Sequence, residues 1–182
     1  MNPGGVGFAN GGSLVKEVVY DRETILTRVG ELAREIEGVY SAEDRLLLVG
    51  VLKGAFIFLS DLARALRIPA QIDFISVSSY GDGQVSSGRV RIEQHPRMPV
   101  EGRNVLLVED IVDSGITLDQ VVSLLLEWGA ATVETCALLH KRIASPDHEP
   151  RFVGFDAPNV FLVGYGLDHA EDFRHLPYIA SL

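Results

Sequence analysis

The sequence predicts an α/β fold in which helices flank a mainly parallel, twisted β-sheet. Residues 46–51 (LLLVGV) and 105–108 are apolar on both faces, which is typical of strands that helices cover on both sides. Stretches with helical spacing of apolar residues alternate with such strands, as in a doubly wound sheet. The 182 residues, of which 47% are apolar and 23% charged, are ordinary for one globular domain.

Local patterns predict the individual elements in order along the chain. Apolar, β-branched runs indicate strands at residues 14–20, 46–51, 71–77, 89–93, 105–108, 132–139 and 160–165. Helical spacing indicates helices at residues 22–37, 56–66 and 118–128. Asp21 is a typical N-cap, and Gly38 and Gly129 end the first and third helices. We interpret the Gly-rich residues 1–13 as a flexible tail and residues 14–182 as the single domain.

Charge and cysteine content exclude several classes of protein. A formal net charge of −9 argues against a protein that coats nucleic acid or an anionic membrane through a broad basic surface. Cys136 is the single cysteine, so an intramolecular disulfide and every multi-cysteine metal site are excluded. A reduced, cytoplasmic location is the simplest interpretation.

The predicted sheet topology indicates where a ligand would bind. In open α/β sheets, ligands bind outside the carboxyl ends of the strands. Four segments that directly follow apolar strands are polar or contain glycine, at residues 52–54, 109–117, 140–142 and 166–168. We therefore expect these four segments to converge on one site.

Residues 105–117 (VLLVEDIVDSGIT) form the most informative of these segments. The adjacent acids Glu109 and Asp110 suit the vicinal diol of a ribose with Mg²⁺ nearby, and Asp113 follows them. Ser114 and Thr117, with a glycine between them, precede a helix whose free N–H groups can bind a phosphate. On pattern alone, either hydroxyl is more often an ordinary helix N-cap. A cap, however, does not explain the acidic pair.

This segment resembles the phosphoribosyl-pyrophosphate motif of the type I phosphoribosyltransferases, and its EDIxDSGxT form resembles their hypoxanthine–guanine branch. Residues 49–66 (VGVLKGAFIFLSDLARAL) resemble the pyrophosphate-binding loop and helix of the 6-oxopurine enzymes, and residues 160–179 (VFLVGYGLDHAEDFRHLPYI) their C-terminal motif. The resemblance covers residues 15–179. It implies the type I phosphoribosyltransferase fold with a small hood subdomain, formed by N-terminal residues and the C-terminal segment. It also implies a cis Leu52–Lys53 peptide bond.

The resemblance implies a role for each matched residue. Asp113 would be the catalytic acid–base group at purine N7. The binding residues would be Lys53, Gly54 and Arg174 for pyrophosphate; Glu109, Asp110, Asp113, Ser114, Gly115, Ile116 and Thr117 for the ribose and 5′-phosphate; Lys141, Phe161, Leu162 and Asp168 for the purine; and Glu109, Asp110 and Asp168 for Mg²⁺. Ser79 and Tyr80 would belong to a lid. From the residues alone, Phe161 is more typical of a core position, Asp168 and Arg174 of a surface pair, and Lys53 of a solvated strand end.

The function implied by this resemblance is purine salvage. Hypoxanthine or guanine and phosphoribosyl pyrophosphate would give IMP or GMP and pyrophosphate, with Mg²⁺ as cofactor. The partners would be these two substrates and further copies of the chain, in a homodimer or homotetramer, with neither nucleic acid nor membrane. Two alternatives stay open: use of xanthine, and a metabolite-sensing regulator that binds RNA through a concentrated basic face.

Overall fold

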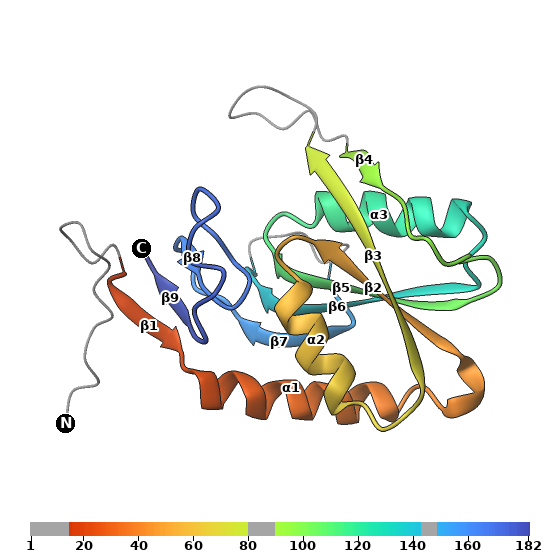
Figure 1. Cartoon of the computed structure of the whole chain (residues 1–182), viewed down its shortest axis with the longest axis horizontal. Coiled ribbons are helices and arrows are strands. Elements are labelled where there is room, and N and C mark those ends of the chain that lie inside the picture. The colour runs from red at the N-terminus through yellow and green to blue at the C-terminus, as the bar shows by residue number, and fades with distance from the viewer. Residues whose placement is uncertain (1–14, 80–89, 143–148) are drawn as a thin grey trace.

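A six-stranded sheet forms the centre of the protein (Figure 1). The structure is a computed structural model, and it describes residues 15–79, 90–142 and 149–182. The strands lie in the order β4 (Val90–Gln94), β3 (Ala70–Ser79), β2 (Leu46–Leu52), β5 (Asn104–Val112), β6 (Thr132–His140) and β7 (Phe152–Asp156). Only the β3–β4 pair is antiparallel. The predicted α/β class with a mainly parallel sheet is therefore confirmed.

Helices cover both faces of this sheet, which explains the unbroken apolar runs. The helices α1 (Arg22–Glu37) and α2 (Phe56–Ala65) lie on one face, and α3 (Ile116–Glu127) lies on the other (Figure 1). Leu46 and Leu48 of β2 pack in the cluster that contains α1 and α2. Leu47 and Val49 point the opposite way and pack in the cluster that contains α3. Successive side chains of β2 thus enter two different cores, and both sets must be apolar.

The ends of α1 are those that its sequence predicts. The Asp21 carboxylate accepts a hydrogen bond from the Thr24 N–H at 2.8 Å. The Gly38 N–H donates to the Arg34 carbonyl and ends the helix. Side-chain capping of this kind stabilises a helix by about 1 kcal/mol.

A second, antiparallel sheet joins the two ends of the domain. It has the order β1 (Glu17–Tyr20), β9 (Ile179–Ser181) and β8 (Leu162–Val163). Ala180 of the central strand β9 lies between Val18 of β1 and Val163 of β8. This sheet consists of the N-terminal and C-terminal segments that the sequence assigned to a hood. The division into a tail, a domain and a hood stays a prediction, and residues 1–14 lie outside the described residues.

The predicted strand at residues 160–165 is wrong in length and in place. Only Leu162–Val163 is a strand, and it belongs to the second sheet. The edge strand beside β6 is instead β7, which the sequence analysis missed because Gly154 interrupts its apolar pattern. A Cβ atom at Gly154 would overlap the Leu138 carbonyl of β6, so the close approach of the two strands requires glycine. The strand β9 was likewise not predicted, because it is too short to show a periodicity.

Candidate active site

The segments after β2, β5 and β6 meet at one edge of the sheet. These three strands are adjacent and parallel, so their carboxyl ends lie together. The segment at residues 166–168 also reaches this edge, although it does not follow a strand of the main sheet. A Cβ atom at Gly166 would overlap the carbonyl oxygen of Gly54, which shows how closely the two segments approach. All four segments therefore converge, as expected. The fourth, however, comes from the second sheet and not from a strand of the main sheet.

The acidic pair lies within β5 and not after it. The sequence analysis ended this strand at Val108, but its pairing with β6 continues through Glu109 opposite Ala137 to Val112 opposite His140. Both carboxyl groups are therefore held on a strand and are only partly exposed. Burial and the neighbouring Asp110 carboxylate raise the pKa of Glu109 well above its ordinary value, and burial raises the pKa of Asp110. Such a pair is stabilised in its charged form by a cation or by hydroxyl donors.

The start of α3 has the features of a phosphate site. Gly115 is the N-cap with φ +78°, and as a glycine it supplies no side-chain cap. Interpretation of Ser114 or Thr117 as an ordinary cap is therefore wrong. Both residues and Ile116 are exposed at the positive end of the helix dipole, where the first backbone N–H groups of a helix have no partner within the helix. A conformation with positive φ favours glycine at position 115.

Asp113 and Lys141 form an ion pair at the ends of β5 and β6. The Lys141 ammonium lies 3.3 Å from the Asp113 carboxylate, and the Lys141 N–H donates to the Val112 carbonyl at 2.9 Å. The Lys141 side chain is 14% exposed, whereas that of Asp113 is 61% exposed. A carboxylate open to solvent thus stands beside a cation that the fold holds in place.

Lys53 and Gly54 form a tight turn after β2. The Leu52–Lys53 peptide bond is cis, as the family resemblance implies. A Cβ atom at Gly54 would overlap the Asp110 carboxylate, so a side chain at this position would displace the acidic pair. Glycine at position 54 therefore allows the β2 turn to approach β5.

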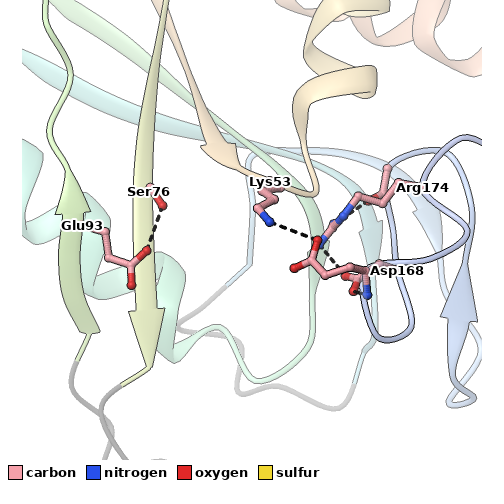
Figure 2. A network of polar contacts seen from close by, with 7 residues as sticks. Lys53, Ser76, Glu93, Asp168 and Arg174 are labelled. Carbon is pink, nitrogen blue, oxygen red and sulfur yellow. Dashed lines mark hydrogen bonds and ion pairs between the residues drawn. The ribbon is translucent and has the colours of Figure 1, made fainter.

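The other predicted cation, Arg174, lies opposite Lys53 (Figure 2). Its guanidinium is 2.8 Å from the Asp168 carboxylate and donates to the Gly166 carbonyl at 2.8 Å. Lys53 and Arg174 also both contact Glu171, at 3.0 and 3.4 Å. The structure thus brings Lys53, Asp168 and Arg174 together, as predicted. The sequence analysis assigned no role to Glu171, because its contacts depend on how the turn at residues 168–172 folds.

The predicted purine-binding residues of the C-terminal segment lie next to this turn. Phe161 is 55% exposed, so the alternative that it is a core residue is wrong. Its ring lies nearly perpendicular to that of His169, with the ring centroids 5.4 Å apart. Leu162 is buried in β8. An exposed aromatic ring at this position is available to stack on a planar ligand.

The predicted lid is described only at its edge. Ser79 is the last residue of β3 and pairs with Val90 of β4. A hydrogen bond of 3.4 Å between Ser76 of β3 and Glu93 of β4 links the same two strands farther from this edge (Figure 2). Tyr80 and the rest of the segment lie outside the described residues, so the lid stays a prediction.

The carboxylates fit Mg²⁺ only if a substrate supplies further ligands. Among residues 15–79, 90–142 and 149–182, no group of three His, Cys, Asp or Glu side chains is arranged to hold a metal ion. Glu109 and Asp110 are two adjacent hard oxygen ligands with raised pKa values. Mg²⁺ typically binds one or two carboxylates together with substrate phosphates and water. The donor set therefore fits this ion in a complex with a phosphorylated substrate.

Comparison with known proteins gives consistent matches. A family model described as the phosphoribosyl transferase domain matches residues 17–170. The hypoxanthine-guanine phosphoribosyltransferase of Mycobacterium avium is 47% identical over 174 residues, which cover 92% of this chain and 86% of that protein. The protein of the same name from Dictyostelium discoideum is 43% identical over 171 residues, covering 92% and 95% of the two chains.

Solved structures agree with these matches. A hypoxanthine phosphoribosyltransferase from Staphylococcus aureus has a TM-score of 0.85 to this structure at 37% identity, and the match covers 92% of this chain and 91% of that one. In the part of the chain that the structure describes, no helix is long and apolar enough to span a membrane.

Proposed function

The chain belongs to the phosphoribosyl transferase family, and on that premise we propose that it is a 6-oxopurine phosphoribosyltransferase of purine salvage. It converts hypoxanthine or guanine and phosphoribosyl pyrophosphate to IMP or GMP and pyrophosphate. The relatives named for hypoxanthine and guanine support this choice of base.

The observation that carries the proposal is the Asp113–Lys141 pair. A 6-oxopurine presents N7 and the O6 acceptor side by side on one edge, whereas adenine presents an amino donor in place of O6. A carboxylate and an ammonium 3.3 Å apart match this edge, because the Lys141 ammonium donates to O6 while the Asp113 carboxylate meets the N7 proton. Adenine would place its amino donor against the Lys141 donor. This pair therefore selects for a 6-oxo group.

The remaining residues bind the sugar and the phosphates. Ser114 to Thr117 hold the 5′-phosphate at the start of α3. Glu109 and Asp110 accept hydrogen bonds from the ribose hydroxyls, and these two carboxylates would bind Mg²⁺ together with oxygens of the substrate. When bound, Mg²⁺ neutralises charge on the diphosphate and so favours its departure.

Cation contacts and base stacking complete the site. Lys53, the Gly54 N–H and Arg174 bind the diphosphate, and the exposed face of Phe161 stacks on the purine, beside the backbone of Leu162. Closure of the lid at Ser79 and Tyr80 keeps water from the reacting ribose carbon.

The reaction exchanges one bond at C1′ of the ribose. N9 of the purine bonds to C1′, and the bond from C1′ to the diphosphate oxygen breaks. The electron pair of that bond leaves with pyrophosphate. The proton at N7 passes to the Asp113 carboxylate, which restores the neutral purine. Each residue role in this scheme is part of the proposal.

A pyrophosphate-release assay tests the proposed function. The protein is supplied with Mg²⁺ and phosphoribosyl pyrophosphate, and hypoxanthine, guanine, xanthine, adenine and uracil are offered one at a time. We expect turnover with hypoxanthine or guanine and none with adenine or uracil, and the xanthine arm resolves the open alternative. If folded protein binds phosphoribosyl pyrophosphate but turns over no base, the enzyme assignment is wrong and a regulator is favoured. A cytoplasmic location and a dimer or tetramer belong to the same proposal.

A further inference from the structure

One carboxylate oxygen contacts both cations that are proposed to bind the diphosphate. Glu171 Oε2 lies 3.0 Å from Lys53 Nζ and 3.4 Å from Arg174 Nη2. Lys53 and Glu171 are 118 residues apart in the sequence. The Glu171 side chain is exposed beside a cation, so its carboxyl group is an anion at neutral pH. A carboxylate therefore already makes contacts that a diphosphate oxygen would make.

The contact between Glu171 and Lys53 is open to solvent. The two side chains are 66% and 64% exposed. Ion pairs this exposed add little to the stability of a fold, because water and salt screen them. The Glu171 carboxylate can therefore exchange for another anion without disturbing the chain around it.

Arg174 differs from Lys53, because it keeps its place when Glu171 moves away. Its guanidinium is 20% exposed and holds two further partners, the Asp168 carboxylate and the Gly166 carbonyl. The Arg174 Nε atom is buried and has no hydrogen-bond partner within residues 15–79, 90–142 and 149–182. Of the two cations, only Lys53 loses its sole carboxylate partner among the described residues when Glu171 leaves.

The backbone brings the Glu171 side chain to this position. The Glu171 N–H donates to the Asp168 carboxylate at 2.9 Å. His169 and Asp172 exchange two backbone hydrogen bonds around it, at 3.2 and 3.1 Å. Glu171 itself has φ +69°, a conformation that non-glycine residues rarely adopt. The turn therefore specifies the direction of the side chain.

We propose that the Glu171 carboxylate competes with the diphosphate for Lys53 and Arg174, and so weakens the hold of the site on phosphoribosyl pyrophosphate and on the pyrophosphate product. This role rests on the proposed function. The direction in which anion binding changes when the Glu171 charge is removed distinguishes a competing role from a supporting one. A residue that only positioned Lys53 would weaken anion binding when removed, whereas removal of a competing anion strengthens it.

The test is the variant Glu171→Gln, which keeps the size of the side chain and removes its charge. Binding of inorganic pyrophosphate to the full chain is measured by calorimetry at low and high salt. We expect the dissociation constant to fall about two- to five-fold at low salt, the size of effect that exposed ion pairs give. The gain should shrink at high salt. In steady-state assays the KM for phosphoribosyl pyrophosphate and the inhibition constant of pyrophosphate should fall, with less change in the KM for the purine.

Two controls accompany this variant. Glu127 is an exposed residue at the C-terminal end of α3, away from the site. The variant Glu127→Gln removes the same unit of charge and should leave pyrophosphate binding unchanged. In a Lys53→Gln background, the effect of Glu171→Gln should be smaller, because one of its two cations is gone.

The outcomes distinguish this inference from the proposed function. Equal or weaker pyrophosphate binding by Glu171→Gln overturns the competing role, whatever the turnover. Failure of the unmodified chain to bind pyrophosphate overturns it as well. If pyrophosphate binds, and binds more tightly to the variant, but no 6-oxopurine is turned over, the competing role stands and the proposed function fails.

Discussion

Two halves of the candidate site are built in different ways. The strand-end cluster, Glu109, Asp110, Asp113 and Lys141, lies within or directly after the adjacent strands β5 and β6. The turn cluster, Lys53, Asp168, Glu171 and Arg174, joins the end of β2 to an irregular segment near the C-terminus. Backbone pairing of two parallel strands positions the first cluster, whereas side-chain ion pairs and an uncommon turn position the second.

The turn cluster also has the less regular backbone. Ala170, Glu171 and Phe173 all have positive φ, at +52°, +69° and +75°. Such conformations are sparsely populated and persist only where the surroundings impose them. The difference indicates that the residues proposed for proton transfer and base selection lie on paired strands, while those proposed to bind the diphosphate are groups that can exchange partners.

The largest expected effect belongs to the strand-end cluster. Asp113→Asn removes the proposed proton acceptor and should lower turnover about 10²- to 10⁴-fold. Its side chain is 61% exposed, so the melting temperature should stay nearly unchanged. Steady-state kinetics and thermal unfolding check the two parts. Near-normal turnover by the folded variant would remove Asp113 from catalysis.

The next effect tests whether the turn cluster depends on a close backbone approach. Gly166 has φ +103°, and a Cβ there would overlap the Gly54 carbonyl. Gly166→Ala should lower the melting temperature by roughly 6–12 °C, since strain and overlap together cost about 3 kcal/mol. Gly102→Ala is the matched control, because Gly102 has φ +65° but open space around it. Its expected loss is about 2–4 °C. Equal losses would show that the approach to Gly54 contributes nothing.

Base recognition gives a smaller effect within the strand-end cluster. Lys141→Ala removes the charged donor proposed for O6, and a hydrogen bond to a charged group is worth about 1.5–3 kcal/mol. The KM for hypoxanthine should therefore rise about 10- to 100-fold, with less change in the KM for phosphoribosyl pyrophosphate. Equal changes in both constants would contradict its assignment to the base.

The smallest effect is a dependence of stability on pH. Because the pKa of Glu109 is raised in the fold, the folded chain keeps a proton that the unfolded chain has released between the two pKa values. This contribution to stability is full below the ordinary pKa of glutamate and is lost as the pH rises through the raised value. In the Glu109→Gln variant the melting temperature should fall less as the pH rises than it does in the unmodified chain, and the raised pKa of Asp110 should leave part of the fall in place.

An exposed glutamate provides the control for this pH dependence. The pKa of Glu43 is lowered by a hydrogen bond with Ser41, so Glu43→Gln should leave the decline intact. If Glu43→Gln reduced the fall of melting temperature with rising pH as much as Glu109→Gln does, burial of the acidic pair would not be the cause of that fall.

Local pattern was enough to predict much of the main sheet and the strand-end cluster. Burial on both faces shows in sequence as an unbroken apolar run, which marked β2 and the first part of β5. The acids, hydroxyls and glycine that follow within one strand–loop–helix unit are neighbours in the sequence as well as in space. Even there, the end of β5 was placed too early. Apolar pattern alone does not show that backbone pairing with β6 continues past Val108.

Tertiary structure alone decided the rest of the site. The sequence resemblance pointed to Lys53 and Arg174, but the contact of both with Glu171 arises only when β2 and the C-terminal turn come together. The same is true of Gly54, Gly166 and Asp110, whose close approaches join three distant segments. Propensity and periodicity describe residues a few positions apart. Contacts across more than a hundred residues depend on the order of strands in the sheet, which only the folded chain determines.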